Sequence, residues 1–326
     1  MTNPAIPPVF LVLGRTGQIG YELSRRLGAL GVVVAPTRKE VDLLACDSVR
    51  NILDRVKPAA VVNAAAFTSV ERAELVPQLC ARLNADAPAF IAAECKRAGS
   101  VFVHFSTDYV FDGCKGTPYV ETDEARPLCV YGATKLAGEQ AVVAEGGKHL
   151  VFRTSWVYAT RGRNFPATVV RLAQERDDLA VVNDQTGAPT SAAAIADGVC
   201  AVLARILDPA SPADASDAAW GLYHMTADGS TTWYDFAKTI LNEDPRMAIA
   251  ERRCRAVRAI TSAEHQSKVR RPAYSVLCND KLARQFGVRL PAWEAQWRAT
   301  VDALGVIPSP EPGATAVSPQ LDPWIA

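Results

Sequence analysis

The sequence predicts an α/β protein, with a doubly wound parallel sheet followed by a smaller C-terminal α+β lobe. Short runs of mostly apolar residues, such as Val9–Leu13 and Val101–Phe105, alternate with stretches whose apolar residues recur at helical spacing. Strands that are apolar on both faces are typical of a parallel sheet covered by helices on both sides. A turn with three glycines, from Gly14 to Gly20, follows the first run directly. The length of 326 residues leaves room for a second lobe beside the sheet domain.

The first half of the chain supplies most of the predicted sheet. Its expected strands are Val9–Leu13, Val32–Ala35, Ala59–Ala65, Val101–Phe105 and Leu150–Thr154. Its expected helices are Gly17–Leu30, a long helical region over residues 77–98 in which Pro88 starts a second helix, and Tyr131–Glu145. Because crossovers between parallel strands are right-handed, these helices should cover both faces of the sheet.

The second half of the chain is less regular. Helices are expected at Asn164–Arg176, at Ala192–Leu207 and from an N-cap at Thr231 or Thr232 through Ile240. Short strands are expected at Leu179–Asn183 and Gly221–Met225. Residues 208–219 read as a surface loop rich in Ala, Asp, Ser and Pro, and the proline-rich residues 307–326 read as a poorly ordered tail.

The overall charge argues against several classes of partner. The chain has 35 basic and 35 acidic side chains, so it has no net charge with which to hold a nucleic acid or an anionic membrane. No apolar run is long enough to span a bilayer, and the first eight residues do not resemble a secretion signal. The eight cysteines are scattered without C-x-x-C spacing and are expected to be reduced thiols. These features favour a cytoplasmic protein.

The glycine turn is the first feature that points to a ligand. Gly14, Gly17 and Gly20 follow the G-x-x-G-x-x-G spacing. Gly14 permits a sharp exit from the strand, Gly17 lets the backbone approach a pyrophosphate, and Gly20 allows close packing of helix on sheet. The following helix N-terminus offers free N–H groups to an anion. A tight turn without a ligand has the same glycines, but the position at the first strand–helix junction favours a Rossmann dinucleotide-binding domain.

The end of the second predicted strand bears on the choice of cofactor. An acidic residue there would bind the ribose 2′-hydroxyl of NADH, but the chain has Arg38 and Lys39 instead. A guanidinium pairs well with a 2′-phosphate, so NADPH is favoured over NADH, unless the two are simply solvated loop cations. We therefore expect residues 1–160 to form mainly the NAD(P)-binding domain and residues 161–306 to combine the last Rossmann elements with a substrate-binding lobe.

A tyrosine and a lysine provide candidate catalytic groups. Tyr131 and Lys135 stand four residues apart on a predicted helix, so both project from one face. Reduction of a ketone needs a proton donor, and a nearby ammonium lowers the pKa of a phenol toward neutrality. Ser106 and Thr107 end the fourth predicted strand, at the edge where such sheets bind ligands, and offer a hydroxyl to orient the tyrosine.

Other residues have simpler interpretations. His104 and His224 lie in apolar strands and are expected to be core histidines. Trp233 is expected to pack the smaller lobe. The pair Arg270 and Arg271 precedes a proline and fits either a contact to a diphosphate or a solvated turn.

Six motifs occur in an order that resembles a known family. They are Gly14–Gly20, Asn63–Ala66, Ser106–Phe111, Tyr131–Lys135, Phe152–Tyr158 and Asn183–Thr190. Together they resemble the dTDP-4-dehydrorhamnose reductases, which are extended short-chain dehydrogenases of dTDP-L-rhamnose synthesis. The resemblance runs from about residue 9 to residue 304, and the last two motifs are its most specific part.

The resemblance implies a reaction and a set of site residues. NAD(P)H would reduce C4 of the nucleotide sugar dTDP-4-dehydro-β-L-rhamnose, with Tyr131 as proton donor, Lys135 tuning it and holding the ribose, and Thr107 assisting. Asp108 and Trp156 would contact the sugar. The implied cofactor site consists of Gly17, Gln18, Ile19, Asp42, Leu43, Ala65, Ala66 and Phe67. Some members dimerise through a magnesium site, but this sequence shows no carboxylate cluster that would hold Mg²⁺; a monomer and a homodimer both remain open.

Two other interpretations remain open at this stage. Nucleotide-sugar epimerases and 4,6-dehydratases share the fold and the Tyr–Lys pair. A dehydratase commonly has an Asp-Glu pair after the strand-end threonine, whereas here Asp108 is followed by Tyr109. A non-catalytic Rossmann regulatory subunit is the third candidate, although such a protein has no need of both Tyr131 and Lys135.

Overall fold

The computed structural model describes residues 7–208, 219–249 and 252–306. The expected tail at 307–326 and nearly all of the expected loop at 208–219 lie outside these ranges. Six parallel strands form the central sheet in the order β10-β5-β4-β3-β1-β2. They are β1 (Val9–Leu13), β2 (Val32–Val34), β3 (Ala60–Asn63), β4 (Val101–Thr107), β5 (His149–Thr154) and β10 (Gly221–His224). The predicted doubly wound α/β class is confirmed.

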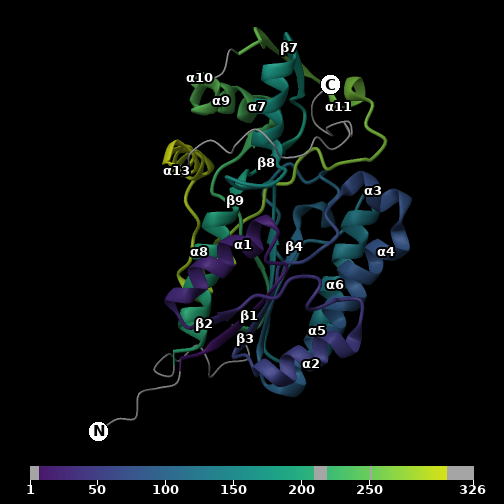
Figure 1. The fold of residues 1–326 in the computed structure, drawn as a ribbon. Helices are drawn as coiled ribbons and strands as arrows, with labels where there is room; N and C mark the ends of the chain where they lie inside the picture. The colour runs from purple at the N-terminus through teal and green to yellow at the C-terminus, as the bar shows by residue number, and fades with distance from the viewer. Residues whose placement is uncertain (1–6, 209–218, 250–251, 307–326) are drawn as a thin grey trace.

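Helices cover both faces of this sheet (Figure 1). One face carries α1 (Gln18–Arg26), its 3₁₀ extension η1 (Leu27–Ala29), α8 (Ala192–Ile206) and α12 (Asp280–Phe286). The other face carries α2 (Cys46–Val56), α5 (Ala87–Ala98) and α6 (Val130–Glu145). Successive residues of a strand point to opposite faces, so Phe10 belongs to the first core and Leu11 to the second.

The long helical region predicted over residues 77–98 is confirmed, and its second α-helix begins at Ala87, next to the predicted Pro88. After the short helix α3 (Val70–Leu75), Pro77 begins α4 (Pro77–Ala81), and a π-helical turn, η2 (Arg82–Asp86), leads into α5. Pro88 lies in the first turn of α5, where its fixed φ suits a helix start.

The smaller lobe sits above the carboxyl ends of the strands and consists mainly of short elements (Figure 1). Its helices are α7 (Phe165–Glu175), α9 (Trp233–Glu243), α10 (Arg246–Ile249), α11 (Ser262–His265) and α13 (Trp293–Val306). Three strand pairs accompany them: β7 (Asp178–Val182) with β12 (Ala256–Ile260), β8 (Thr186–Gly187) with β11 (Thr231–Thr232), and β6 (Val157–Tyr158) with β9 (Thr190–Ser191). An aromatic core including Tyr158, Phe165, Phe236 and Trp297 holds the lobe together.

The helix predicted from Asn164 and the N-cap predicted at Thr231 or Thr232 are both confirmed. Asn164 caps α7 by accepting from Ala167 N, and Thr232 caps α9 by accepting from Asp235 N. The predicted strand near residue 221 is the outermost member of the central sheet, beside β5, so the chain returns to the Rossmann domain after building part of the lobe.

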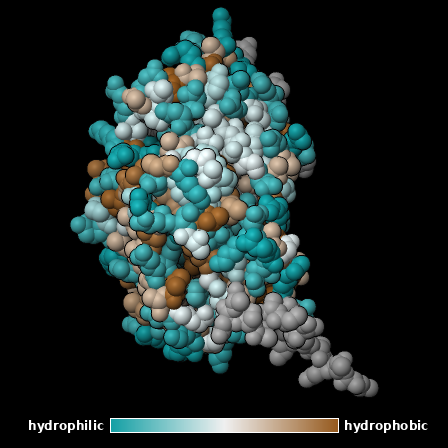
Figure 2. Space-filling model, turned by 180° about the vertical axis from the view of Figure 1, so that it is seen from behind, coloured by the Kyte–Doolittle hydropathy of each residue, from teal (hydrophilic) through white to brown (hydrophobic). Residues whose placement is uncertain are grey.

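The surface carries polar and apolar side chains intermixed (Figure 2). Within the part of the chain that the structure describes, no helix combines the length and apolar character needed to cross a membrane.

Candidate active site

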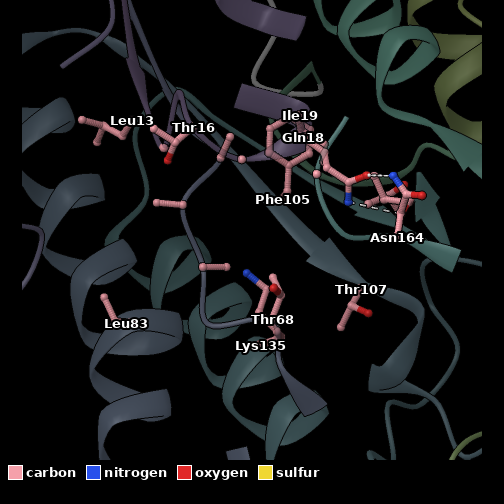
Figure 3. A pocket seen from close by; sticks show the side chains of 18 of the residues that line it. Leu13, Thr16, Gln18, Ile19, Thr68, Leu83, Phe105, Thr107, Lys135 and Asn164 are labelled. Atoms are coloured by element: carbon pink, nitrogen blue, oxygen red, sulfur yellow. Dashed lines mark hydrogen bonds between the residues drawn. The ribbon is translucent and has the colours of Figure 1, made fainter. Parts of the chain in front are cut away.

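A cavity of about 670 Å³ opens at the carboxyl ends of the central strands, below the smaller lobe. Its floor includes the strand-end residues Leu13, Thr107 and Thr154. The crevice at the carboxyl edge is where doubly wound sheets bind their ligands. Figure 3 shows side chains from the glycine turn, from β4, from α6 and from the segment before α7 gathered around this one space.

Most of the residues predicted from the sequence line this cavity. They are Gly14, Gly17, Gln18, Ile19, Arg38, Asp42, Leu43, Ala65, Ala66, Thr107, Asp108, Tyr131, Lys135 and Trp156. The fold therefore brings together the glycine turn, the loop after the second strand, the strand-end hydroxyl and the Tyr–Lys pair, which are spread over more than a third of the chain.

The three glycines of the turn do different things. Gly14 has φ +86°, and a Cβ there would lie 2.6 Å from Ala65 N. A Cβ on Gly20 would lie 2.2 Å from the carbonyl oxygen of Gly14, so this glycine permits helix α1 to pack on the turn. Gly17 has an ordinary φ of −75°, and a Cβ there would meet nothing closer than 3.4 Å. Packing within the protein thus explains why glycine is needed at positions 14 and 20. At position 17 it does not, because a Cβ there would fit without a clash.

Several arginines are among the residues that line the cavity. Arg38 is exposed and lines the cavity, whereas the adjacent Lys39 does not. Arg15 also lines it and donates to the carbonyl oxygen of Ala35 at 3.1 Å. Arg161 and Arg163 reach the same cavity from the segment before α7. Arg161 and Arg163 are not predicted from the sequence, because no local pattern beside them indicates a ligand site.

The phenol of Tyr131 lies beside Thr107 but is not acidified. Its ring lines the cavity, and its hydroxyl is hydrogen-bonded to the side chain of Thr107. Burial raises the pKa of Tyr131 above its usual value, and the bond to Thr107 opposes that shift only in part. The pKa of Tyr131 is therefore not lowered as the sequence predicted, because burial outweighs the hydrogen bond that lowers it and Lys135 is not among the groups that shift it.

The amine of Lys135 makes its contact with His104. The two nitrogens, Nζ of Lys135 and Nε2 of His104, are 3.1 Å apart in a buried setting. Burial lowers the pKa of Lys135 to about 8, while the Glu139 carboxylate and Cys80 act in the opposite direction. The amine still lines the cavity below Tyr131, one helical turn further along α6. Figure 3 labels Lys135 and Thr107 among the side chains that line this space.

Asp108 is a buried acid with one unpaired oxygen. Its Oδ1 accepts from Thr107 Oγ1 at 3.2 Å, whereas its Oδ2 has no hydrogen-bond partner. Burial raises the pKa of Asp108 to about 7, against hydrogen bonds from Ser275 and Thr107 that lower it. Ser106 Oγ and Thr154 Oγ1 are also buried without a partner and line the same cavity. Three unsatisfied polar atoms in one space indicate a site for a polar ligand.

Two tryptophans form part of the lobe side of the cavity. Trp156 and Trp233 both line it, which the sequence reasoning expected for Trp156 alone. Trp156 has a left-handed backbone with φ +46°, and Gly187 lies against its ring, where a Cβ would come within 2.4 Å.

A hydrogen bond also connects the lobe to the glycine turn: Asn164 Nδ2 donates to Gln18 Oε1 at 3.1 Å (Figure 3).

Some predicted residues do not line the cavity. Gly20 packs under the turn, as described above. Phe67 is held through its backbone by Asn84, which accepts from the N–H at 2.8 Å and donates to the carbonyl oxygen at 3.0 Å, and its ring lies near Arg72. The implied cofactor contact of Phe67 therefore finds no support in the cavity lining.

The arginine pair before Pro272 does not line the cavity either. The side chain of Arg271 is buried and bonded to Glu71 of α3 and to Ser267 of the lobe. It connects the two parts of the molecule, so the diphosphate interpretation of this pair is not supported.

No group of three or more His, Cys, Asp or Glu side chains that could hold a metal ion occurs among the described residues.

The sequence matches a family model over nearly its whole length. Residues 9–306 match the RmlD substrate binding domain. A protein of Burkholderia thailandensis named dTDP-4-dehydrorhamnose reductase is 45% identical over 285 residues, which cover 87% of this chain and 94% of that protein. A protein of the same name from Escherichia coli is 40% identical and covers 90% of this chain and 97% of its own length.

Solved structures with the same name have the same fold. The reductase of Bacillus anthracis, crystallised in complex with NADP, superposes with a TM-score of 0.82 at 28% identity over 91% of this chain and all of that chain. The ortholog from Clostridium acetobutylicum gives a TM-score of 0.81 at 33% identity, with the same coverage. On these matches and on the site described above, the chain belongs to the dTDP-4-dehydrorhamnose reductase family.

Proposed function

We propose that this chain uses NAD(P)H to reduce the C4 keto group of dTDP-4-dehydro-β-L-rhamnose, giving dTDP-β-L-rhamnose. The observation that carries the proposal is one cavity that joins a glycine turn for a dinucleotide to a phenol, a hydroxyl and an amine suited to carbonyl reduction. The curated relatives at 40–45% identity carry the name of this activity.

The residues around the turn fit a dinucleotide. Gly17 leaves space on the cavity side that protein packing does not require, at the N-terminus of α1 where free N–H groups favour a pyrophosphate. Arg38 lines the cavity beyond it and supports NADPH over NADH, because a guanidinium binds the 2′-phosphate with two hydrogen bonds. Gln18, Ile19, Asp42, Leu43, Ala65 and Ala66 complete the proposed cofactor site.

The other end of the cavity fits the sugar. Asp108 presents an unpaired carboxyl oxygen, and Trp156 presents an aromatic face to a ring whose C–H groups pack well on it. The pKa of about 7 means that Asp108 can hold a proton at neutral pH and donate a hydrogen bond to a sugar oxygen.

The residues of the chain handle the proton of the reaction. The bound cofactor supplies the hydride that adds to C4 of the sugar. The C4 oxygen then takes the proton of the Tyr131 hydroxyl, which the raised pKa keeps in place until an alkoxide develops. Thr107 turns its single O–H from Asp108 to the phenolate that remains and stabilises it, and the Lys135 amine, one helical turn along α6, supplies positive charge when it is protonated. Solvent returns the proton to Tyr131 after the product leaves.

The chain also fits the reductases better than it fits two related classes. Asp108 is followed by Tyr109, so the acid pair expected of a 4,6-dehydratase is missing. Tyr109 is half-buried at the cavity wall, and its ring meets Tyr131 edge to face at 5.5 Å, so a phenol occupies the position where a dehydratase has its second acid. A regulatory subunit would have no use for unpaired buried polar atoms beside a Tyr–Lys pair.

An NADPH-oxidation assay tests the proposal directly. Purified protein should oxidise NADPH with dTDP-4-dehydro-β-L-rhamnose and much more slowly with UDP-linked 4-keto sugars. Tyr131→Phe should lower kcat by about 10²–10⁴-fold and leave NADPH binding unchanged. Protein that purifies with tightly held oxidised cofactor and consumes no NADPH would instead favour an epimerase or dehydratase.

The proposal also covers the division of the chain into domains, its cellular compartment and its oligomeric state. Residues 1–160 are mainly the cofactor domain, and residues 161–306 return to the sheet through β10 and α8 and supply the substrate lobe. All eight cysteines are free thiols, which favours the reducing cytoplasm. The site is built from one chain, and both a monomer and a homodimer are compatible with it.

A further inference from the structure

A buried chain of hydrogen bonds leads from the cavity wall to the catalytic amine. The backbone N–H of Ala65 donates to Asn63 Oδ1 at 3.2 Å. Asn63 Nδ2 lies 3.3 Å from His104 Nδ1, and His104 Nε2 lies 3.1 Å from Lys135 Nζ. Asn63 and His104 are opposite each other on neighbouring strands β3 and β4, and each is only 1% exposed.

The donors and acceptors of this chain determine its direction. The Ala65 N–H can only donate, so it holds the amide of Asn63 with its oxygen toward the backbone and its NH₂ toward His104. His104 Nδ1 must then accept, which places the ring proton on Nε2. Burial, and after it the charge of Lys135, keep the pKa of His104 well below its usual value, so the ring is neutral and carries that single proton.

The direction of these hydrogen bonds affects whether Lys135 is protonated. An Nε2–H that points at Nζ needs a lone pair on that nitrogen, which the amine has and the ammonium lacks. The ammonium instead needs a bare Nε2, and therefore a proton on Nδ1 of His104 and an Asn63 amide turned by half a rotation. That turn breaks the bond from the Ala65 N–H to Asn63 Oδ1 and places the amide NH₂ against this donor, so two donors face each other at the cavity wall.

We propose that His104 is a positioning residue for Lys135. Through Asn63 and His104, the hydrogen bond that the Ala65 N–H makes at the cavity wall determines whether the Lys135 nitrogen is held as an amine or as an ammonium. His104 thus has a part in the reaction, not only in the core of the sheet. The inference deepens the proposed function, because it assigns a control of the Lys135 amine, but its first test does not require turnover.

The other groups around Lys135 do not provide this control. Glu139, one turn along α6, is bonded through both oxygens to Arg153 of β5, at 2.9 and 2.7 Å. Cys80 of α4 is hydrogen-bonded to Thr134. Tyr131 lies on the cavity side. His104 is the group from the strand side that contacts the amine itself.

A double-mutant cycle read by NMR tests the transmission. The titration of Lys135 is followed by ¹³C NMR of protein labelled at lysine Cε, with Lys135→Met to assign its signal. Asn63→Asp accepts from both sides and places the ring proton on Nδ1, so His104 offers a bare Nε2 and the pKa of Lys135 should rise. In His104→Leu the same Asn63→Asp change should move this pKa far less, because the connecting ring is gone.

Enzyme kinetics provide a second test of the role of His104. His104→Leu should lower kcat by about tenfold or more with little change in NADPH affinity, because a misplaced catalytic group can cost up to about 100-fold. His104→Gln, whose amide can accept from the ammonium, should recover part of that loss. His149→Gln is the matched control, since His149 is a buried histidine of the neighbouring strand β5 whose Nδ1 contacts only the Gly147 carbonyl at 3.0 Å.

The possible outcomes separate this inference from the proposed function. An equal rise of the Lys135 pKa by Asn63→Asp with and without the His104 ring would show a simple charge effect and overturn the inference. Unchanged Lys135 titration and unchanged kcat in folded His104→Leu would overturn it as well. A protein that reduces no keto sugar but shows the coupled titration would refute the proposed function and leave the relay standing.

Discussion

The indole rings of Trp156 and Trp233 stack face to face, with their centroids 3.4 Å apart and their planes at 6°. Trp156 follows β5 of the central sheet, whereas Trp233 begins α9 of the smaller lobe. The pair therefore joins the two parts of the molecule at the wall of the cavity. Trp233 is fixed in turn by Gln185, which accepts from its Nε1 at 3.2 Å, so the position of Trp156 depends on the lobe.

This stacking predicts that Trp233 influences sugar binding through Trp156. Trp233→Phe should raise KM for the nucleotide sugar by about two- to tenfold, since an aromatic pair contributes about 0.5–1.5 kcal/mol beyond its burial. The KM for NADPH should not change. Trp293→Phe is the matched control, because Trp293 belongs to the same aromatic core but does not line the cavity. Equal effects of the two changes would show that only lobe stability matters.

Gly17 and Gly20 should respond differently to an added methyl group. Gly17→Ala should weaken NADPH binding by about tenfold or more, because its Cβ enters space proposed for the pyrophosphate, and the melting temperature should stay close to that of the unmodified chain. Gly20→Ala should lower the melting temperature, because its Cβ would meet the Gly14 carbonyl oxygen at 2.2 Å. Calorimetric NADPH titration and thermal unfolding measure the two effects; tight NADPH binding by Gly17→Ala would remove the turn from the proposed site.

Arg38 should select between the two nicotinamide cofactors. Arg38→Ala should raise KM for NADPH by about tenfold while changing KM for NADH much less, because a charge-assisted hydrogen bond contributes about 1.5–3 kcal/mol. The neighbouring Lys39→Ala removes an equal charge that does not line the cavity and should leave the ratio nearly unchanged. If both changes have the same effect, the selection comes from general charge and not from Arg38.

Asp108 should make the protein less stable as the pH rises. The pKa of Asp108 is raised to about 7 by burial, whereas an unfolded aspartate titrates near about 4, so the folded state holds the extra proton between these values. The contribution of Asp108 to the free energy of unfolding is therefore most favourable below about pH 4, and it becomes less favourable as the pH rises to about 7.

The isosteric change Asp108→Asn removes that dependence. The variant should be more stable than the unmodified chain by up to about 4 kcal/mol above about pH 7, with the difference vanishing toward about pH 4. Urea unfolding at several pH values measures it. Asp42→Asn, at an exposed aspartate of the same cavity, should show no such gain. A constant difference at all pH values would mean that Asp108 does not titrate in this range.

Local patterns were enough to predict most of the sheet and its first ligand turn. The run Val9–Leu13 is a strand with those bounds, and the predicted Leu150–Thr154 differs from β5 by one residue. The helix Cys46–Val56 was missed because its ends lack the usual signals. Its N-cap is Ala45, which offers no side-chain acceptor, and its C-cap is Lys57 in a left-handed conformation where glycine is the common residue.

The candidate site was predictable where its residues stand next to each other in the sequence. The glycines of the turn, Thr107 with Asp108, and Tyr131 with Lys135 each form a short motif whose spacing indicates chemistry. Trp233 and Arg163 reach the same cavity from segments whose local sequence resembles ordinary helix starts and loops. Their place depends on how the lobe folds back over the sheet.

The sequence by itself determined the doubly wound sheet, the dinucleotide turn and the Tyr–Lys pair, because periodicity, glycine spacing and helix geometry act over a few residues. Only the tertiary structure decided what surrounds those groups. His104 lies 31 residues before Lys135, and its contact depends on the register of β4 against β3 and on the packing of α6 across the sheet. The raised pKa of Tyr131 has the same origin, since burial depends on every element that closes the cavity, not on the neighbours of a residue in the chain.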